Sequence, residues 1–364
     1  MKQIHKTVPL PKDLYTRRYF TDSTVFFDIE TTGFSRKYAF VYLIGMAVRK
    51  EDSLHVYQFL AQNRREEAAV LSAFYDMLPL GCDLVTFNGS GFDIPFLKQR
   101  EACCGISGGR WDSYRYTDLY KLTAKLSRLF QLPDKKQKSV ERFLGIERED
   151  RCSGGELIDV FFQYEKQQDL PSETLLLLHN YEDVLGMAKL LSLLSYRDLF
   201  VQPVRLADAR ILEEERTKKL YLTLTAPVSF PVPCVLQDGP YCLLCKDSAA
   251  GLKIDISCGE MRYYYENFKE YYYLPEEDMA IHKSVAAYVD PAHRRRATAS
   301  NCYTKRDGCF LPQEEGLFSP CLYPGKKAGR SYFAVTEAFL RDTDALERYA
   351  SYALRGFFPQ AGQL

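Results

Sequence analysis

The order of the apolar runs most constrains how this chain can fold. Three β-rich runs follow one another near the start of the chain, at residues 23–30, 40–50 and 53–61. Glu51 and Asp52, which separate the second run from the third, suit a tight hairpin turn. Beyond them, segments with helical spacing alternate with short strand-like runs as far as about residue 199. This order predicts an α/β domain with a mixed sheet.

The individual elements follow from periodicity and from turn residues. The first twenty residues, with prolines at positions 9 and 11, are expected to form an extended arm. Further strands are expected at 83–88 and at the beginning of 115–130, and helices at 65–78, 92–104, the remainder of 115–130, about 155–168 and 172–195. Residues 132–146 are expected to form a basic loop and a short helix that ends at Gly145.

The composition changes after residue 199. Residues 200–220 are highly charged and are predicted to form a linking helix. From residue 221 onward, prolines flank short β-like runs, and tyrosines crowd at 263–265 and 271–273. We therefore expect three parts: a first domain over 1–199, the linking helix over 200–220, and a smaller β-rich or α+β domain of unknown function over 221–364.

Charge and cysteine content narrow the functional classes only in part. The chain has 48 basic and 48 acidic residues, whereas proteins that bind nucleic acid mainly through its phosphates are usually basic. Such a partner is still compatible with this balance, because metal-binding acids would offset local basic patches. The 11 cysteines are scattered, and Cys242 and Cys245 lack the second close pair of a structural zinc site. Buried free thiols are the expected state.

The sequence shows no targeting or membrane signal. No apolar run approaches the about 20 residues that a membrane helix needs. The N-terminal stretch contains no apolar segment of signal-peptide length. A cytoplasmic protein without a membrane partner is therefore expected.

Two acids stand at the end of the first strand. Asp28 and Glu30, in "VFFDIETTGF", are two residues apart, so both side chains leave the same face of a strand. Their charges repel unless one is protonated or a cation lies between them, and no Lys or Arg follows before Arg36. Oxygen ligands of this kind favour Mg²⁺ or Mn²⁺. Because similar pairs also occur on exposed strand ends, other residues must decide between these interpretations.

Three further residues can join this pair. Asp93 opens the helix after the strand at 83–88, either as an ordinary helix N-terminal acid or as a third carboxylate at the same sheet edge. Asp183 interrupts an apolar helix, where a buried carboxylate needs a partner or a metal. His179 lies four residues earlier on the same helical face, where the alternative is a structural His–Asp hydrogen bond.

In these contexts Asp28, Glu30, Asp93 and Asp183 resemble the acids of the DEDD superfamily of 3′–5′ exonucleases, whose fold is ribonuclease-H-like. "FDIETTG" is similar to the proofreading pattern D-x-E-T-T-G, and "NGSGFDIPFL" to the version shared with family B DNA polymerases. "HNYEDVL" and "KSVERFLGIERED" resemble segments of bacterial YprB-like proteins. The resemblance spans about residues 20–196 and implies a mixed five-stranded sheet flanked by helices.

The resemblance also implies a reaction. The four carboxylates would hold two Mg²⁺ or Mn²⁺ ions, without an organic cofactor, and single-stranded DNA or RNA would be shortened from its 3′ end to nucleoside 5′-monophosphates. His179 would orient or deprotonate the attacking water. The superfamily has either Tyr four residues before the last Asp or His five before it. Here His stands at the tyrosine spacing, which leaves the identity of the general base open.

Further residues are candidates for supporting roles. The resemblance implies contacts with the 3′ end from the residues around the first two motifs: Thr31, Thr32, Gly33, Asn88 and Phe92. Basic runs and one aromatic could contact phosphates and bases, or could simply be solvated or core residues: Lys135, Lys136, Lys138, Arg294, Arg295, Arg296 and Phe34. Asp118 is an outer candidate at a strand end, whereas Asp112 and Asp159 are expected to be surface or capping acids.

Two other functions stay open at this point. The same fold could serve as a non-catalytic nucleic-acid-binding module, although degenerate relatives usually lose one or more acids. A ribonuclease-H-type endonuclease also uses clustered acids and two metal ions. The sequence does not choose between DNA and RNA and names no protein partner.

Overall fold

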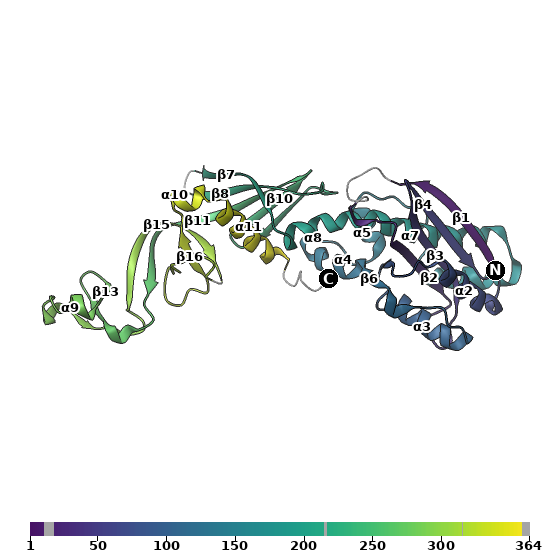
Figure 1. The fold of residues 1–364 in the computed structure, drawn as a ribbon, viewed down its shortest axis with the longest axis horizontal. Coiled ribbons are helices and arrows are strands. Elements are labelled where there is room, and N and C mark those ends of the chain that lie inside the picture. The colour runs from purple at the N-terminus through teal and green to yellow at the C-terminus, as the bar shows by residue number, and fades with distance from the viewer. Residues whose placement is uncertain (11–17, 215–216, 315, 359–364) are drawn as a thin grey trace.

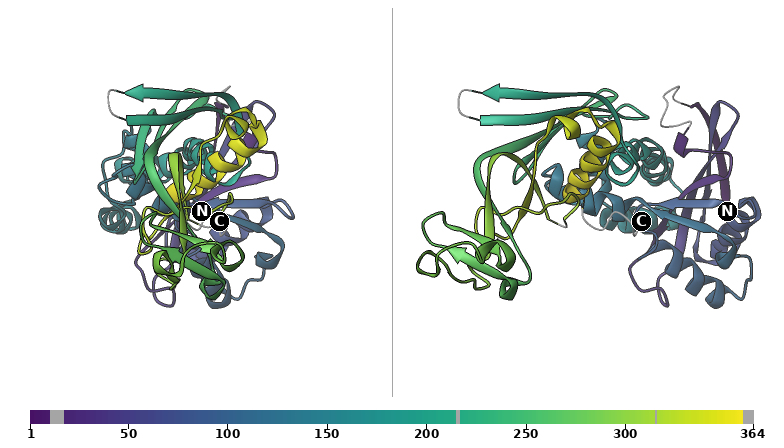
Figure 2. Two further views of the ribbon diagram at one scale, coloured as in Figure 1. Left: turned by 90° about the vertical axis from the view of Figure 1, so that its left-hand side faces the viewer. Right: turned by 60° about the vertical axis from the view of Figure 1, so that its left-hand side comes forward.

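The computed structural model describes residues 1–10, 18–214, 217–314 and 316–358. The chain forms an N-terminal α/β part and a C-terminal β-rich part, which lie at opposite ends of the long axis (Figures 1 and 2). The helices α8 (Leu194–Val201) and α11 (Thr343–Phe357) contact each other between the two parts (Figure 1).

A six-stranded mixed sheet forms the centre of the N-terminal part, in the order β1-β4-β3-β2-β5-β6. Strand β2 lies inside this sheet, antiparallel to β3 and parallel to β5. The residues Val25, Phe26 and Phe27 of β2 are completely buried, so both faces of the strand are covered. The bounds are β1 Lys2–Pro9, β2 Thr24–Thr31, β3 Val41–Lys50, β4 Ser53–Leu60, β5 Asp83–Thr86 and β6 Arg115–Asp118.

The prediction of an extended N-terminal arm is wrong over residues 2–9. These residues form β1, which makes the sheet six-stranded instead of five-stranded. Strand β1 pairs with β4 along its whole length, from Lys2 opposite Leu60 to Pro9 opposite Ser53. It is an edge strand with mostly exposed polar side chains, so it lacks the apolar run that marks the buried strands. Pro9 is tolerated at its end. Residue 11 lies outside the described residues.

The helices expected in the N-terminal part are confirmed within a few residues. Among the helices that the structure describes, none combines the length and apolar character needed to cross a membrane. Helix α7 packs against β2, β3 and β4, which brings its polar residues to the end of β2. The bounds are α2 Glu67–Met77, α3 Asp93–Cys104, α4 Leu119–Leu129, α5 Gln137–Phe143, α6 Gly154–Gln167 and α7 Leu170–Leu190.

The prediction of a linking helix over residues 200–220 is wrong. Residues Arg205–Glu214 form strand β7, which pairs antiparallel with β8, Thr217–Thr225. In β8 the residues Leu220, Leu222 and Leu224 are fully buried and alternate with more exposed ones, so the pattern has the period of a strand. The Arg and Glu content of β7 suggests a helix, but this strand pairs with β8 and leaves its charges in solvent. Residues 215 and 216 lie outside the described residues.

The C-terminal part is β-rich, as expected. Its larger sheet joins β7 and β8 to β9 Cys234–Asp238, β10 Tyr241–Lys246, β11 Ala249–Tyr264, β15 Tyr303–Gln313 and β16 Ser331–Ala334. Its apolar core is continuous with that of the N-terminal part, because Tyr196 stacks on Phe230 and Phe200 on Phe358. The division into domains at 1–199 and 221–364 stays a prediction.

The expectation of free thiols is wrong for two cysteines. Cys258 of β11 and Cys309 of β15 face each other in the antiparallel register and form a disulfide. Their separation of 51 residues gave no hint of this pairing, which depends on strand register. The remaining nine cysteines are free, and of these only Cys82, Cys245 and Cys302 are buried.

A buried ion pair fixes the helix that carries Asp93. The Glu67 carboxylate of α2 accepts hydrogen bonds from Arg100 Nε at 2.7 Å and from Arg100 Nη2 at 2.6 Å, and also from the Val41 backbone N–H at 2.9 Å. Both side chains are almost fully buried. The pair therefore ties α2 and α3 to β3.

Replacing Arg100 with Leu should lower the free energy of unfolding by about 3–5 kcal/mol, because it leaves the Glu67 carboxylate buried and unpaired. The double substitution Glu67→Leu/Arg100→Leu should cost less than the single one, since no isolated charge remains. Urea unfolding of the three proteins measures both values. A double variant less stable than Arg100→Leu would contradict this account.

Candidate functional site

The first acids of the site lie on β2 and α3. Asp28 is half-buried and Glu30 is buried, and both project from β2 near its carboxyl end. Asp93 begins α3 and is also buried, and one of its carboxylate oxygens accepts a hydrogen bond from the Ile29 backbone N–H at 3.2 Å. This bond joins the start of α3 to the segment of β2 between the two acids. The predicted convergence of Asp93 with Asp28 and Glu30 is therefore seen in the structure.

Asn180 of α7 supports Asp28 from the neighbouring helix. Its Nδ2 lies 3.1 Å from a carboxylate oxygen of Asp28, and its Oδ1 accepts a hydrogen bond from Gln58 Nε2 at 3.0 Å. The close approach needs Gly45, which lies opposite Asp28 on β3, because a Cβ there would come within 2.0 Å of Asn180. The sequence reasoning missed Asn180 and Gln58, although Asn180 is the residue after His179 in the third motif.

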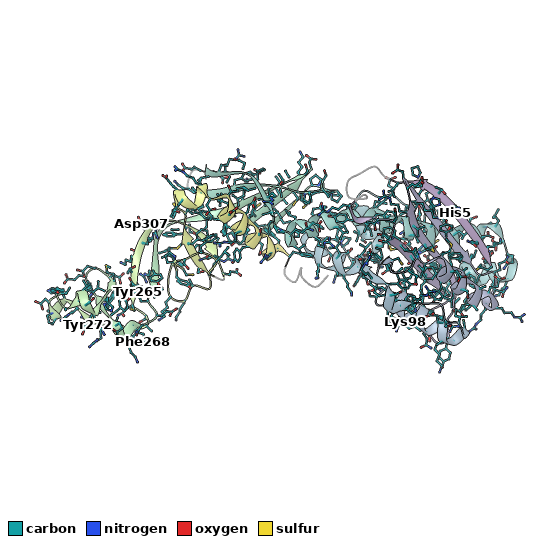
Figure 3. All side chains as sticks on the ribbon, viewed as in Figure 1. His5, Lys98, Tyr265, Phe268, Tyr272 and Asp307 are labelled. Carbon is teal, nitrogen blue, oxygen red and sulfur yellow. A yellow bond between two sulfur atoms is a disulfide. The ribbon has the colours of Figure 1, made fainter. Side chains whose placement is uncertain are left out.

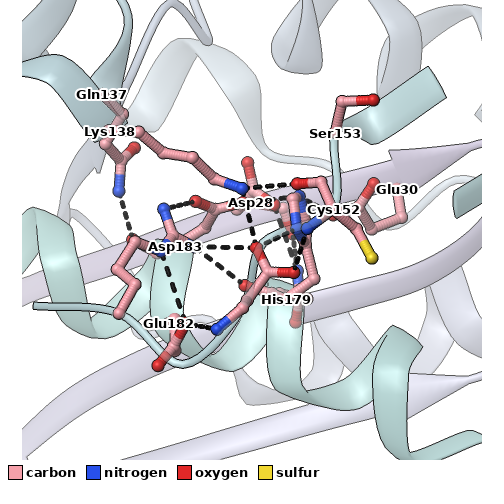
Figure 4. Close-up of polar contacts among 12 residues, drawn as sticks. Asp28, Glu30, Gln137, Lys138, Cys152, Ser153, His179, Glu182 and Asp183 are labelled. Atoms are coloured by element: carbon pink, nitrogen blue, oxygen red, sulfur yellow. Dashed lines mark hydrogen bonds and ion pairs between the residues drawn. The ribbon is translucent and has the colours of Figure 1, made fainter. Parts of the chain in front are cut away.

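His179 connects the two halves of the site (Figure 4). Its Nε2 lies 3.1 Å from Asp183 and 3.5 Å from Glu30, while its Nδ1 lies 2.7 Å from Asp150. Potential ligand atoms of Glu30, His179 and Asp183 all lie within 4.8 Å of one another. The ring is thus held between carboxylates on both sides, and its two nitrogens have separate partners.

Asp150 was not predicted from the sequence, and it fixes the histidine. One of its oxygens contacts His179 and the Lys138 ammonium, at 2.7 and 2.8 Å, and the other accepts a hydrogen bond from the Cys152 backbone N–H at 2.9 Å. Lys138 also donates to the Cys152 carbonyl (Figure 4). Lys138, a candidate phosphate contact, is therefore engaged within the protein, whereas Lys135 and Lys136 are exposed.

A second missed residue, Arg148, neutralises Asp183. Its guanidinium lies 2.7 Å from Asp183, 3.1 Å from Glu141 and 3.4 Å from Glu182, and the side chain is only 8% exposed. The segment "KSVERFLGIERED" contains Glu141, Arg148 and Asp150, so its resemblance to YprB-like proteins was the one available signal for these residues. Nothing in that segment alone indicates that it folds back onto α7.

The surroundings shift the pKa values of the four acids in opposite directions. Burial, followed by the negative charges of Asp183, Glu30 and Asp93, raises the pKa of Asp28 well above its usual range, and burial beside Asp183 and Asp93 does the same to the pKa of Glu30. Burial raises the pKa of Asp93 to about 7, against the effect of its backbone hydrogen bonds.

Asp183 and His179 differ from these three acids. Burial alone would raise the pKa of Asp183, but the hydrogen bond and charge of His179, together with Arg148, leave it below its usual value. Burial lowers the pKa of His179, but the hydrogen bond to Asp183 and the charges of Asp183 and Asp150 outweigh it and raise the pKa overall. Asp183 and His179 thus stabilise each other's charged forms.

These contacts test whether the site suits a divalent cation. Among the described residues, no Lys or Arg forms an ion pair with Asp28, Glu30 or Asp93. The three carboxylates are crowded at one place and have raised pKa values, which is the arrangement that a bound cation would relieve. Their oxygens suit Mg²⁺ or Mn²⁺. The donor set therefore fits the expected metal, and Asp183 would have to share its charge with Arg148.

The turn before α3 is fastened by Asp118. Its carboxylate accepts hydrogen bonds from the backbone N–H groups of Asn88 at 2.8 Å and Ser90 at 3.2 Å, and it also caps α4. Asn88 adopts a positive φ of 68° and is exposed to solvent. The outer position expected for Asp118 is consistent with this geometry, because it holds the turn that precedes Asp93. Asp112 and Asp159 are exposed, as expected.

The turn after β2 is also held internally. Thr31 donates to the Gly33 carbonyl at 2.9 Å, and Thr32 Oγ1 accepts from the Phe40 backbone N–H at 3.1 Å. Beside this turn Phe34 is 88% exposed, and its ring meets Phe92 edge-on at 6.2 Å. An exposed aromatic ring therefore follows the strand that carries Asp28 and Glu30.

Comparison with known proteins agrees with this architecture. Residues 25–195 match the family model of the ribonuclease H superfamily. Over 183 residues the chain is 28% identical to the uncharacterized protein YprB of Bacillus subtilis; the match covers 50% of this chain and 44% of that protein. The chain thus matches less than half the length of this relative. The ribonuclease-H-like fold expected from the motifs is confirmed, and this segment is similar to the ribonuclease H superfamily.

Two solved structures show weaker similarity. The family B DNA polymerase of the archaeon Pyrobaculum calidifontis has a TM-score of 0.39 at 14% identity, covering 66% of this chain and 33% of the polymerase. Exonuclease I of E. coli in complex with a dA16 oligonucleotide has a TM-score of 0.28 at 12% identity, covering 56% of this chain and 54% of the exonuclease.

The opposite pKa shifts predict opposite effects on metal-free stability. Replacing Asp28 with Asn should raise the melting temperature by about 2–4 °C, because folding disfavours the ionised form of this carboxyl and the amide oxygen can still accept a hydrogen bond from Asn180. Replacing Asp183 with Asn should lower the free energy of unfolding by about 1–3 kcal/mol, because Arg148 and His179 lose a charged partner.

Thermal unfolding in EDTA at neutral pH measures both changes. Asp112→Asn, on an exposed residue of the same part, is the matched control and should have no effect. Destabilisation by Asp28→Asn as large as that by Asp183→Asn would show that repulsion among the acids does not govern the metal-free site.

Proposed function

We propose that this chain is a metal-dependent 3′–5′ exonuclease that shortens single-stranded DNA or RNA and releases nucleoside 5′-monophosphates. The observation that carries the proposal is the convergence of Asp28, Glu30 and Asp93, from β2 and α3, with Asp183 of α7, while none of the first three forms an ion pair with a Lys or Arg of the described residues. A nuclease is what the superfamily match supports. The 3′–5′ direction and the substrate come from the motif resemblance.

Under this proposal, Asp28, Glu30, Asp93 and Asp183 hold two Mg²⁺ or Mn²⁺ ions. When bound, such ions supply positive charge against the scissile phosphate and make water more acidic. The remaining groups of the chain position the reactants. Asn180 fixes Asp28, and the Ile29 backbone N–H fixes Asp93, so the carboxylates are set before substrate arrives.

His179 is the residue that we assign to the water. Because Asp150 holds Nδ1, the other ring nitrogen is directed toward Glu30 and Asp183, where it can accept or return a proton. Arg148 forms an ion pair with Asp183 and thereby partly neutralises the negative charge of this carboxylate. The turn of Thr31, Thr32 and Gly33, together with Asn88 and Phe92, is proposed to receive the 3′ nucleotide.

Metal binding should be coupled to proton release. The raised pKa values mean that the metal-free carboxyls of Asp28, Glu30 and Asp93 hold protons at higher pH than usual, whereas a metal ligand must be ionised. Affinity for Mn²⁺ should therefore rise with pH across the region around the Asp93 pKa of about 7. Calorimetric titration in two buffers of different ionisation enthalpy measures the released protons. Equal apparent heats in both buffers would contradict this expectation.

The activity is tested with matched DNA and RNA oligonucleotides labelled at the 5′ end, incubated with Mg²⁺ or Mn²⁺. We expect progressive shortening from the 3′ end and mononucleotide products, with closed circular single strands left intact. Asp28→Asn or Asp183→Asn should reduce the rate by about 10²–10³-fold, whereas Asp112→Asn should not change it.

The product pattern separates the proposal from its alternatives. Internal fragments and nicked circles would identify a ribonuclease-H-type endonuclease. Binding of oligonucleotides without any product, and without dependence on Asp93, would identify a non-catalytic module. Shortening from the 5′ end would refute the assigned direction.

A further inference from the structure

A small three-stranded sheet lies at the end of the molecule farthest from β1 (Figures 1 and 2). It pairs β13, Met279–His282, and β14, Arg295–Arg296, with the central strand β12, Tyr271–Leu274. We call it the tip sheet. It lies beyond the long strands β11 and β15 and has its own apolar cluster, formed by Ala280, Ala297 and Cys302.

One face of the tip sheet is used for packing. Tyr271 and Tyr273 alternate along β12 and pack on the apolar cluster with Tyr265 and Phe268. Tyr265 stacks on Tyr271 with ring centroids 4.3 Å apart. Because successive side chains of a strand point to opposite faces, Tyr272 is left on the other face of the sheet (Figure 3).

The other face combines an aromatic ring with cations. Arg296 lies directly opposite Tyr272 in the β12–β14 register, and its guanidinium carbon is 4.7 Å from the ring centroid. The guanidinium carbon of Arg294 is 5.0 Å from the same centroid. Arg296 is exposed and Arg294 is half-buried. Arg295 is also exposed, but it lies opposite Tyr273 in the same register and therefore projects from the packed face. Tyr288, six residues before Arg294, is 93% exposed.

The charges of these arginines are not neutralised by the protein. Within the described residues, Arg294, Arg295 and Arg296 form no ion pair with a carboxylate. Arg294 donates one hydrogen bond, to the Ala286 carbonyl. The acid Glu270, whose pKa responds to Arg296, is itself paired with Lys283. Two positive charges on the face of Tyr272, those of Arg294 and Arg296, therefore remain available to an external anion.

The chemistry of this face fits the backbone of a nucleic acid. A guanidinium stacked on an aromatic ring has a fixed plane, and its N–H edges stay free to donate two parallel hydrogen bonds to a phosphate. Aromatic rings beside such cations are a usual platform for unpaired bases; Tyr272, which carries the two arginines, is half-buried, so its role here is to hold their guanidinium planes. An anion with regularly repeated phosphates and flat bases uses both features together.

We propose that Tyr272, Arg294 and Arg296 form a second binding surface for single-stranded nucleic acid, remote from the catalytic acids. This inference rests on the proposed function, because the same strand would reach the acids through its 3′ end. The surface would hold a part of the strand upstream of that end. Long substrates would then bind more tightly than short ones.

The test uses the full chain in EDTA and fluorescence anisotropy with labelled single strands of about 5 and about 40 nucleotides. The variant is Arg294→Gln/Arg296→Gln. The control is Arg210→Gln/Arg341→Gln, which also removes two positive charges from exposed arginines; Arg210 likewise stacks on a tyrosine, Tyr221, at 5.1 Å. Tip-sheet variants should lower the affinity for the long strand about tenfold and leave the short strand unchanged.

Salt dependence gives a second readout. Each lost phosphate contact should reduce the slope of log affinity against log salt by about 0.7, so the tip-sheet variant should lose about 1.4 and the control nothing. Arg294→Lys/Arg296→Lys keeps the charge without the planar stacked group and should lie between the other two proteins. If the glutamine variant does not fold, the lysine variant replaces it in the test, and its affinity for the long strand should be lower than that of the wild-type protein.

Two results would overturn the inference: equal affinities for the long strand in the tip-sheet and control variants, or an arginine-dependent affinity for phosphatidylserine vesicles in place of oligonucleotides. Failure of the proposed function looks different. Wild-type protein would then bind the long strand through the arginines but release no mononucleotides with Mg²⁺ or Mn²⁺.

Discussion

Electrostatic repulsion among carboxylates is the constraint on which the candidate site depends. Asp28, Glu30 and Asp93 are gathered where β2 ends and α3 begins. Hydrogen bonds hold Asp28 and Asp93, and His179 lies 3.5 Å from Glu30, but no Lys or Arg of the described residues pairs with the three acids. Their raised pKa values are the direct result. A protein gains no stability from such crowding. Under the proposed function, this crowding would offer a set of oxygen ligands to a cation.

The fold treats the fourth acid differently. Asp183 lies between His179 and Arg148, so its charge is already balanced before any ligand arrives. Arg148 and Asp150 both come from the segment after α5. In this segment Arg148 pairs with Asp183 of α7, and Asp150 contacts Nδ1 of His179. The site therefore joins an unneutralised side on β2 and α3 to a neutralised side on α7. Such a division places the positive charge of the histidine opposite the acids that need a cation.

The β-rich part continues the apolar core of the N-terminal part and projects a small sheet away from it. Its aromatic residues have two different uses. Tyr265, Tyr271 and Tyr273 are packed together at the tip, whereas Tyr272 faces out beside Arg294 and Arg296. The alternation of a strand separates these uses within three consecutive tyrosines, which composition alone cannot do.

The sequence by itself determined the α/β class, most helices, the buried strands and the four acids with His179, because apolar periodicity and short motifs are local signals. The tertiary structure alone decided the edge strand β1, the strand β7 in place of a helix, and the Cys258–Cys309 bond, since each depends on pairing with a distant strand. It also decided the partners Asn180, Arg148 and Asp150, whose contacts exist only because α7 packs between β2 and the segment after α5.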